Sequence, residues 1–171
     1  FFKDGENTKI KNKMEFNVKL LNVKVFSIIS NSIEIYNKEN LISFTSKTLQ
    51  NKKEKYVNLE YIKKDNNFLI DGSSYKGTSK INNVIGSWWN HKILTADKQI
   101  SPLSGSIKDQ IVTFIKKENL NINEKKILTH KFSLKSKNPN LPDDKKLDFK
   151  IWLNPESNII IKVSYNRMGH W

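Results

Sequence analysis

The side chains most able to do chemistry form one short run, Trp88-Trp89-Asn90-His91, between two regions that alternate like β-strands. Indole rings beside an amide and an imidazole are typical of a small-molecule pocket, whose apolar walls hold a ligand while a few polar groups orient it. The same rings could instead close one end of a sheet and fill its core. The two interpretations are compatible, because adjacent side chains point in different directions on a strand or a helix.

The histidines His91, His130 and His170 have no second histidine at helical spacing, so the sequence predicts no metal site and no cofactor. His130 is in phase with Leu128 and Phe132 and is expected on a buried face, as a core residue or as a polar group lining a pocket. Acid–base catalysis by His91 would need a second positioned group, and no spacing links it to an acid. We therefore predict no catalytic residues and no enzyme.

Two other polar segments lack the pattern of a known site. The serine-rich segment 101–106 has no Gly-x-Ser-x-Gly elbow, and we interpret it as a turn that leads into a strand. Asp143 and Asp144 lie in a polar loop that contains prolines, where adjacent exposed acids usually contact only water. The glycines between residues 72 and 105 are too scattered to form a phosphate-binding loop.

The chain of 171 residues has a formal net charge of +13, which by itself would suggest a nucleic acid, an anionic membrane or an acidic partner. Of its 30 basic residues only Arg167 is an arginine. This bias, together with abundant Asn and Ile, is typical of an A/T-rich genome. Because lysine is poorly suited to bidentate reading of bases and phosphates, we predict no specific nucleic-acid partner. The chain has no cysteine and no apolar run of transmembrane length.

A strict alternation of apolar and polar residues predicts the elements that would position these side chains. It occurs in the runs Met14–Leu20, Val57–Tyr61, Phe149–Leu153 and Ile159–Tyr165. Such a period of two is what an antiparallel sheet with one buried face requires. Turn-forming residues separate the strands at 4–5, 37–40, 51–55, 65–67 and 121–125.

The pattern breaks over residues 72–106, a long insertion that carries four of the six glycines and the tryptophan pair. Within it, residues 87–94 could form one or two helical turns with Ser87 as the N-cap. We therefore predict an all-β fold: one strongly curved antiparallel sheet or half-open β-barrel, with a short helix and long insertion between two sets of hairpins. Residues 1–171 should form a single domain.

Several segments resemble an uncharacterised family of exported Gram-negative proteins, known only as a domain of unknown function. The matching segments are Trp89-Asn90, Ser104-Gly105, Ile151-Trp152-Leu153 and Met168-Gly169-His170-Trp171. Their order covers nearly the whole chain. The resemblance implies a signal peptide in the precursor and a periplasmic or secreted protein. It also implies a strand before Phe1 and further strand residues after Trp171.

The sequence therefore leaves two functions open. The first is a non-enzymatic exported protein that binds an apolar or lipid-like molecule on the concave sheet face, through Trp88, Trp89, Asn90, His91 and His130. The alternative is a structural or protein-interaction module with a filled core and no small-molecule ligand. An apolar cavity of about 300 Å³ or more would favour the first function.

Overall fold

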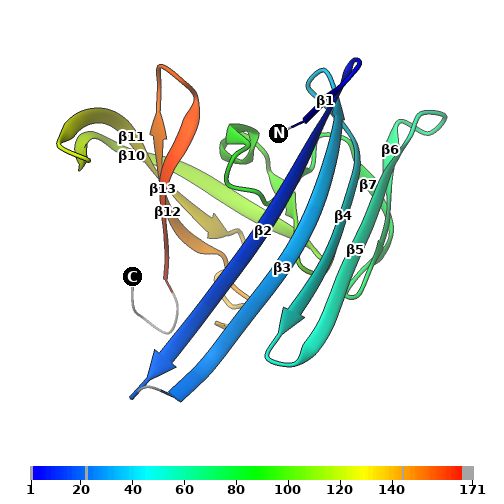
Figure 1. The fold of residues 1–171 in the computed structure, drawn as a ribbon, viewed down its shortest axis with the longest axis horizontal. Helices are drawn as coiled ribbons and strands as arrows, with labels where there is room; N and C mark the ends of the chain where they lie inside the picture. Colours follow the sequence, from blue (N-terminus) through cyan, green and yellow to red (C-terminus); the bar gives the residue numbers. More distant parts are fainter. Residues whose placement is uncertain (1, 22, 144, 167–171) are drawn as a thin grey trace. The chain divides into compact units, whose positions relative to one another are not determined.

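A computed structural model describes residues 2–21, 23–143 and 145–166, and its strands form two antiparallel sheets (Figure 1). The first sheet has seven strands in chain order: β1 (Phe2–Asp4), β2 (Asn7–Leu20), β3 (Val23–Asn37), β4 (Asn40–Gln50), β5 (Lys53–Ile62), β6 (Asn67–Gly72) and β7 (Lys76–Lys80). The second has six strands in the order β13-β12-β11-β10-β9-β8: β8 (Val84–Ile85), β9 (Lys98–Ile100), β10 (Ile107–Ile122), β11 (Lys125–Ser136), β12 (Asp148–Asn154) and β13 (Ile159–Tyr165).

Tight turns fall where the sequence predicts them. Asn51 and Lys52 between β4 and β5 both have a positive φ, as do Asn123 and Glu124 between β10 and β11. A positive φ at both central residues is what a type I′ turn requires, and its twist matches the twist of the strands that it joins. The chain therefore passes from strand to neighbouring strand as a meander.

The prediction of one sheet is wrong, because the chain changes sheets after β7. Alternation within a strand shows that one face is covered, but not which strand pairs with which. The insertion supplies the change: it contains the short strands β8 and β9 and a 3₁₀ helix, η1 (His91–Leu94). The antiparallel all-β class is confirmed, and η1 is the only helix among the described residues.

Contacts along the chain define two compact units. One comprises Phe1–Asn82 and Ile100–Ile107, and the other comprises Asn83–Gln99 and Lys108–Trp171. Each unit has its own buried residues and is described by itself. The single-domain interpretation of residues 1–171 stays a prediction.

The first unit buries one face of the seven-stranded sheet. Phe44, Leu59 and Ile70 are opposite one another on adjacent strands and are fully buried. Glu34 is buried in the same row, where its carboxylate accepts a 2.8 Å hydrogen bond from the Tyr36 hydroxyl. A carboxylate can remain in such a place only when partners replace the water that it has lost.

The serine-rich segment is a turn that leads into β10, as predicted, and it packs against the end of β6. A Cβ added to Gly72 would lie 2.6 Å from the Ser104 carbonyl oxygen, and Gly105 has a φ of +78°. The Ser74 amide donates to the same Ser104 oxygen at 2.9 Å. Glycines are needed here because two backbones touch and because Gly105 adopts a left-handed conformation.

Candidate functional site

The predicted site residues belong to the second unit, where one face of the six-stranded sheet is largely apolar and aromatic. Register places Phe149 opposite Leu134, and Ile151 opposite Phe132, on β12 and β11. Because alternate residues share a face, His130 belongs to the same face. We call this surface the aromatic face; it comprises Leu128, His130, Phe132, Leu134, Phe149, Ile151 and Leu153, with Val112 and Phe114 of β10 opposite Leu134 and Phe132.

Trp88 packs onto the covered part of the aromatic face. Its ring centroid lies 4.8 Å from that of Phe149, which stacks in turn on Tyr165 at 4.5 Å. Trp88 also contacts a fully or mostly buried cluster formed by Ile93, Leu134, Leu147 and Ile151. Both indoles are only partly buried, so neither is enclosed in the core, and Trp88 packs against the outside of the cluster with Phe149 as its ring partner.

The polar residues after the tryptophans shape the backbone of the insertion. The Asn90 side chain caps η1 by accepting the Lys92 amide proton at 3.0 Å, so the helix begins three residues later than a Ser87 cap would place it. Asn90 can do this because its short side chain reaches an amide two residues ahead. Trp89 is partly exposed, and His91 is exposed at the start of η1. Ser87 is buried, and its hydroxyl has no hydrogen-bond partner within the described chain.

His130 lies on a different part of the same face, next to an exposed apolar cluster. Its ring meets the edge of Phe114 at a centroid distance of 5.7 Å, and Phe114 meets Phe132 in the same way at 5.6 Å. Phe114 is 49% exposed and Leu128 is 46% exposed. We call Phe114, Leu128, His130 and Phe132 the exposed aromatic patch. His130 is therefore only partly buried, because the face that it shares with the core continues past the residues that cover it.

The structure does not bring all five predicted residues to one point. Trp88 packs against the cluster that contains Leu134. His130 lies four residues before Leu134 on β11, and four residues along a strand span about 13 Å. The predicted residues thus occupy two ends of one face. Phe114 was missed by sequence reasoning, because only the β10–β11 register places it beside His130.

The described residues form no acid–base pair or metal-ligand group around these side chains. The His91 side chain makes no hydrogen bond or ion pair within the described chain, and Asp109 of β10 pairs with Lys98 at 2.7 Å. No group of three or more potential ligands among the described residues could hold a metal ion. His170 and Arg167 lie outside the described residues.

The opposite face of the same sheet carries a polar network that sequence reasoning also missed. The Trp152 indole N–H donates to Glu118 Oε1 at 2.6 Å, and that carboxylate pairs with Lys116 at 2.7 Å and Lys131 at 3.3 Å. The ammonium groups of Lys131 and Lys162 each lie 4.7 Å from the centroid of the Trp152 ring. The hydrogen bonds from Lys116 and Trp152 lower the Glu118 pKa from 4.5 to about 2.

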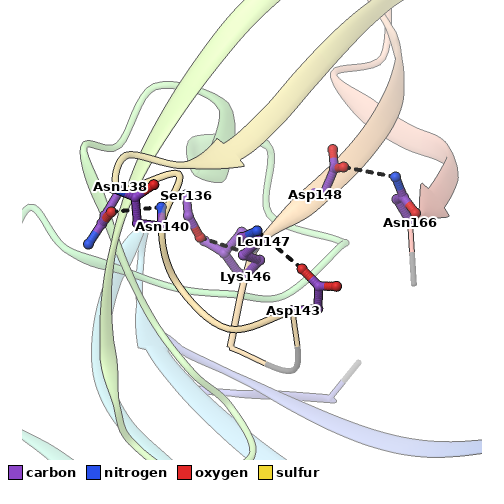
Figure 2. Close-up of polar contacts among 8 residues, drawn as sticks. All are labelled: Ser136, Asn138, Asn140, Asp143, Lys146, Leu147, Asp148 and Asn166. Atoms are coloured by element: carbon purple, nitrogen blue, oxygen red, sulfur yellow. Dashed lines mark hydrogen bonds and ion pairs between the residues drawn. The ribbon is translucent and has the colours of Figure 1, made fainter. Parts of the chain in front are cut away.

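The loop between β11 and β12 is closed by paired polar contacts (Figure 2). Ser136 Oγ accepts the Leu147 amide proton at 2.7 Å, and the Ser136 amide donates to the Leu147 carbonyl at 3.0 Å. Asp143 forms an ion pair with Lys146 at 3.1 Å, so it does not contact water alone as expected. These contacts join the two ends of the loop and hold Leu147 in the core cluster, so we assign the loop a structural role.

Two open hollows are prominent among the described residues, and neither is lined by the predicted residues. A hollow of about 500 Å³ in the second unit is bordered by Leu94–Lys98, Asp109–Val112 and Lys137. A hollow of about 610 Å³ lies on the seven-stranded sheet, where Lys11, Lys13 and Lys47 contribute to its lining. Neither is the apolar cavity against the tryptophans that the ligand-binding hypothesis anticipated.

Comparison with known proteins gives a family over nearly the whole chain. Residues 1–170 match the family described as a domain of unknown function, DUF6134. The chain belongs to the DUF6134 family. No curated protein and no solved structure matches it. The match confirms the resemblance to an uncharacterised domain family, whose C-terminal motif at 168–171 lies outside the described residues.

Within this DUF6134 chain, the other segments that carried the resemblance have structural roles. Asn90 caps η1, Gly105 packs against Gly72, and Trp152 donates to Glu118. Each role depends on a specific side chain or on the lack of one. No helix within the described residues is long and apolar enough to cross a membrane.

Proposed function

We propose that this DUF6134 protein is a non-enzymatic, exported β-protein that binds an apolar or lipid-like molecule on the aromatic face of its six-stranded sheet. The observation that carries the proposal is the exposed aromatic patch. Phe114 and Leu128 are each about half exposed although they belong to a face whose other end is fully buried. Contiguous apolar surface of this kind is characteristic of ligand or partner sites.

The chemistry of the patch suits a ligand with one polar end. Phe114 and Phe132 offer ring edges and faces to an acyl or ring system, while His130 supplies a nitrogen that can donate or accept a hydrogen bond. In this proposal Trp88 has the role of a fixed wall, because Phe149 and the core cluster hold it in place. Trp89, Asn90 and His91 form the part of the insertion closest in sequence to that wall.

Native mass spectrometry of the purified full-length protein, with organic extraction of any bound molecule, tests the proposal. The parent protein should carry extra mass that is released as an apolar or lipid-like compound. Phe114→Ser and Leu128→Ser should lose most of it and keep their melting temperatures. Ile159→Ser is the matched control, since Ile159 is also exposed but faces the other side of the sheet. Ligand-free parent protein, or equal loss in all three variants, would contradict the proposal.

A second function is favoured by the packing of the core. Leu134, Ile151 and Ile93 are fully buried, and the two hollows described above are open rather than enclosed. A filled core with an exposed apolar patch also suits a structural or protein-interaction module. If extraction yields no small molecule and the same Phe114→Ser change abolishes a protein contact, the patch serves as an interface.

Export rests on the family resemblance and is tested separately. The full precursor should be found in a periplasmic or secreted fraction after removal of a signal peptide. Its N-terminus, determined by mass spectrometry of the mature protein, should therefore begin within the precursor sequence. A mature protein that retains its initiator methionine and stays with cytoplasmic markers would contradict export.

A further inference from the structure

Three lysines converge on one hollow of the seven-stranded sheet, on the face opposite its core. Register places Lys13 of β2 opposite Asn31 of β3, and Asn31 opposite Lys47 of β4. Lys11 lies two residues from Lys13 on the same strand and therefore shares its face. Lys13 and Lys47 are separated by two strand spacings, on the order of 10 Å, with the Asn31 amide between them.

The lining of this hollow contains no acidic residue. It consists of Lys11, Asn12, Lys13, Asn31, Ser32, Ile33, Thr45, Ser46, Lys47, Tyr56 and Asn58 around about 610 Å³. Lys13 and Lys47 form no ion pair within the described chain, and Lys11 lies 5.4 Å from the Phe2 ring. The hollow of the second unit differs, since Asp97 and Asp109 line it together with Lys98 and Lys137.

Two acids lie beside the hollow without lining it, and Asp71 is paired with a lysine outside it. Asp71 is opposite Asn58 on the adjacent strand, and its carboxylate pairs with Lys76 at 2.8 Å and accepts the Tyr56 hydroxyl at 3.3 Å. Glu15, on the other side of Lys13 along β2, accepts a 2.8 Å hydrogen bond from the Asn17 side chain. Glu15 keeps its negative charge, because an amide donor does not neutralise a carboxylate, but it does not line the hollow, whose lining carries three lysines and no acid.

We propose that this hollow binds a small molecule that carries a phosphate or sulfate group. The group would lie over Asn31 between Lys13 and Lys47, which act as point charges on its oxygens. The hydroxyl and amide groups of Thr45, Asn58 and Tyr56 would meet a polar, sugar-like body, for which the volume is in the range of small-molecule sites. This proposal is independent of ligand binding on the aromatic face.

The simplest competing account is that these lysines are part of a diffuse positive field. The chain has a net charge of +13, and any anion would then be attracted weakly to many places. The two accounts differ in their response to the removal of two charges. A localised site depends on which lysines are removed, whereas a diffuse field depends only on how many.

The test is titration of the full-length protein with glucose 6-phosphate, with glucose as the uncharged comparison, in about 0.15 M salt to screen distant charges. Amide chemical shifts should change in a saturable way at Lys13, Asn31, Lys47 and Tyr56. The Lys13→Gln/Lys47→Gln variant should bind about tenfold more weakly. Lys63→Gln/Lys64→Gln is the matched control, because it removes the same charge from an exposed turn and should bind like the parent.

Vesicles of phosphatidylglycerol, compared with phosphatidylcholine, distinguish a lipid headgroup from a soluble phosphate. Binding of either probe that is lost in Lys13→Gln/Lys47→Gln and kept in the control supports the site. Absence of saturable binding to both probes, or equal weakening in the two double variants, overturns it. If a variant fails to fold, the amide chemical-shift changes of the parent protein still show whether the probe binds at this hollow.

Discussion

The two faces of the six-stranded sheet each shield a tryptophan, but by different means. On the aromatic face, Trp88 contacts Phe149 and an apolar cluster. On the opposite face, Trp152 is only 5% exposed although its cross-strand neighbours are Lys131 and Lys162. Lysine stems can cover an indole while their ammonium groups reach water, and the ring attracts those cations. A buried tryptophan therefore does not identify the apolar side of a sheet.

The difference extends to what each face can do. The aromatic face ends in apolar surface that is exposed at Phe114 and Leu128, so it can accept an apolar ligand or partner. On the other face, Glu118 already has three donors and the indole nitrogen is already satisfied. That face is a closed polar network, and we assign it a structural role.

The largest effect should follow from a cavity beneath the aromatic face. Ile151 is fully buried in the core cluster, so Ile151→Ala should lower the free energy of unfolding by about 3 kcal/mol. Ile159→Ala is the matched control: this side chain is 55% exposed, and its removal should cost less than about 0.5 kcal/mol. Urea denaturation measures both. Equal losses would show that the aromatic face is not the stabilising core of this unit.

A smaller effect should separate the adjacent tryptophans. Trp88 is partly exposed but packs on Phe149 and the core cluster, so Trp88→Ala should cost about 2 kcal/mol, less than a fully buried indole. Trp89→Ala should cost less than Trp88→Ala. Thermal melts and tryptophan emission of both variants provide the measurement. A greater loss of stability in Trp89→Ala than in Trp88→Ala would contradict our assignment of Trp88 as the fixed wall.

The contribution of the opposite face to stability should depend on pH. Because the folded pKa of Glu118, about 2, lies below its ordinary 4.5, the stabilisation from its charge is complete above pH 4.5 and is lost as pH falls toward 2. The melting temperature of Glu118→Gln should therefore lie below that of the parent at neutral pH, and the gap should narrow below pH 4.5. Trp152→Phe keeps the carboxylate but removes one donor, so it should show part of this loss. A gap that stays constant down to pH 2 would exclude the charge as the cause.

The sequence was enough to predict which segments form strands and where the turns lie. It was not enough to predict which apolar side chains of those strands are exposed. Phe16 and Val18 lie in phase with the other apolar residues of β2, yet they are 48% and 38% exposed. Val18 is opposite Phe26 of β3, and the β3–β4 ladder extends only to Ile28 opposite Gln50. Among the described residues, no third strand pairs with this part of the hairpin. Periodicity reports the face of a side chain but not whether another element covers it.

Bulges limited the prediction in the second sheet. The alternation through Ile159 and Ile161 predicted those residues on the inner face together with Val163. A register shift between Trp152 and Leu153 instead places Ile160 opposite Leu153 and against the core cluster. A bulge inserts one extra residue and therefore inverts the alternation beyond it. Val163, opposite Ile151, keeps its predicted face.

The candidate site was predictable only where its residues are neighbours in the chain. Trp88, Trp89, Asn90 and His91 could be recognised together from their order alone. The contact of Phe114 with His130 depends on the β10–β11 register and its shift between Phe114 and Lys116. That register is set by a tight turn and by side-chain packing along the whole hairpin.

By itself the sequence determined the strand class, the turns and the lack of cysteine chemistry, because these depend on residues close together in the chain. The tertiary structure alone decided that there are two sheets. It also brought Trp152 to Glu118, 34 positions away in the chain, and placed Lys13 and Lys47 on either side of Asn31. Such pairings follow from strand order and register. Those are fixed by the summed burial and hydrogen bonding of whole strands, and no local pattern encodes that sum.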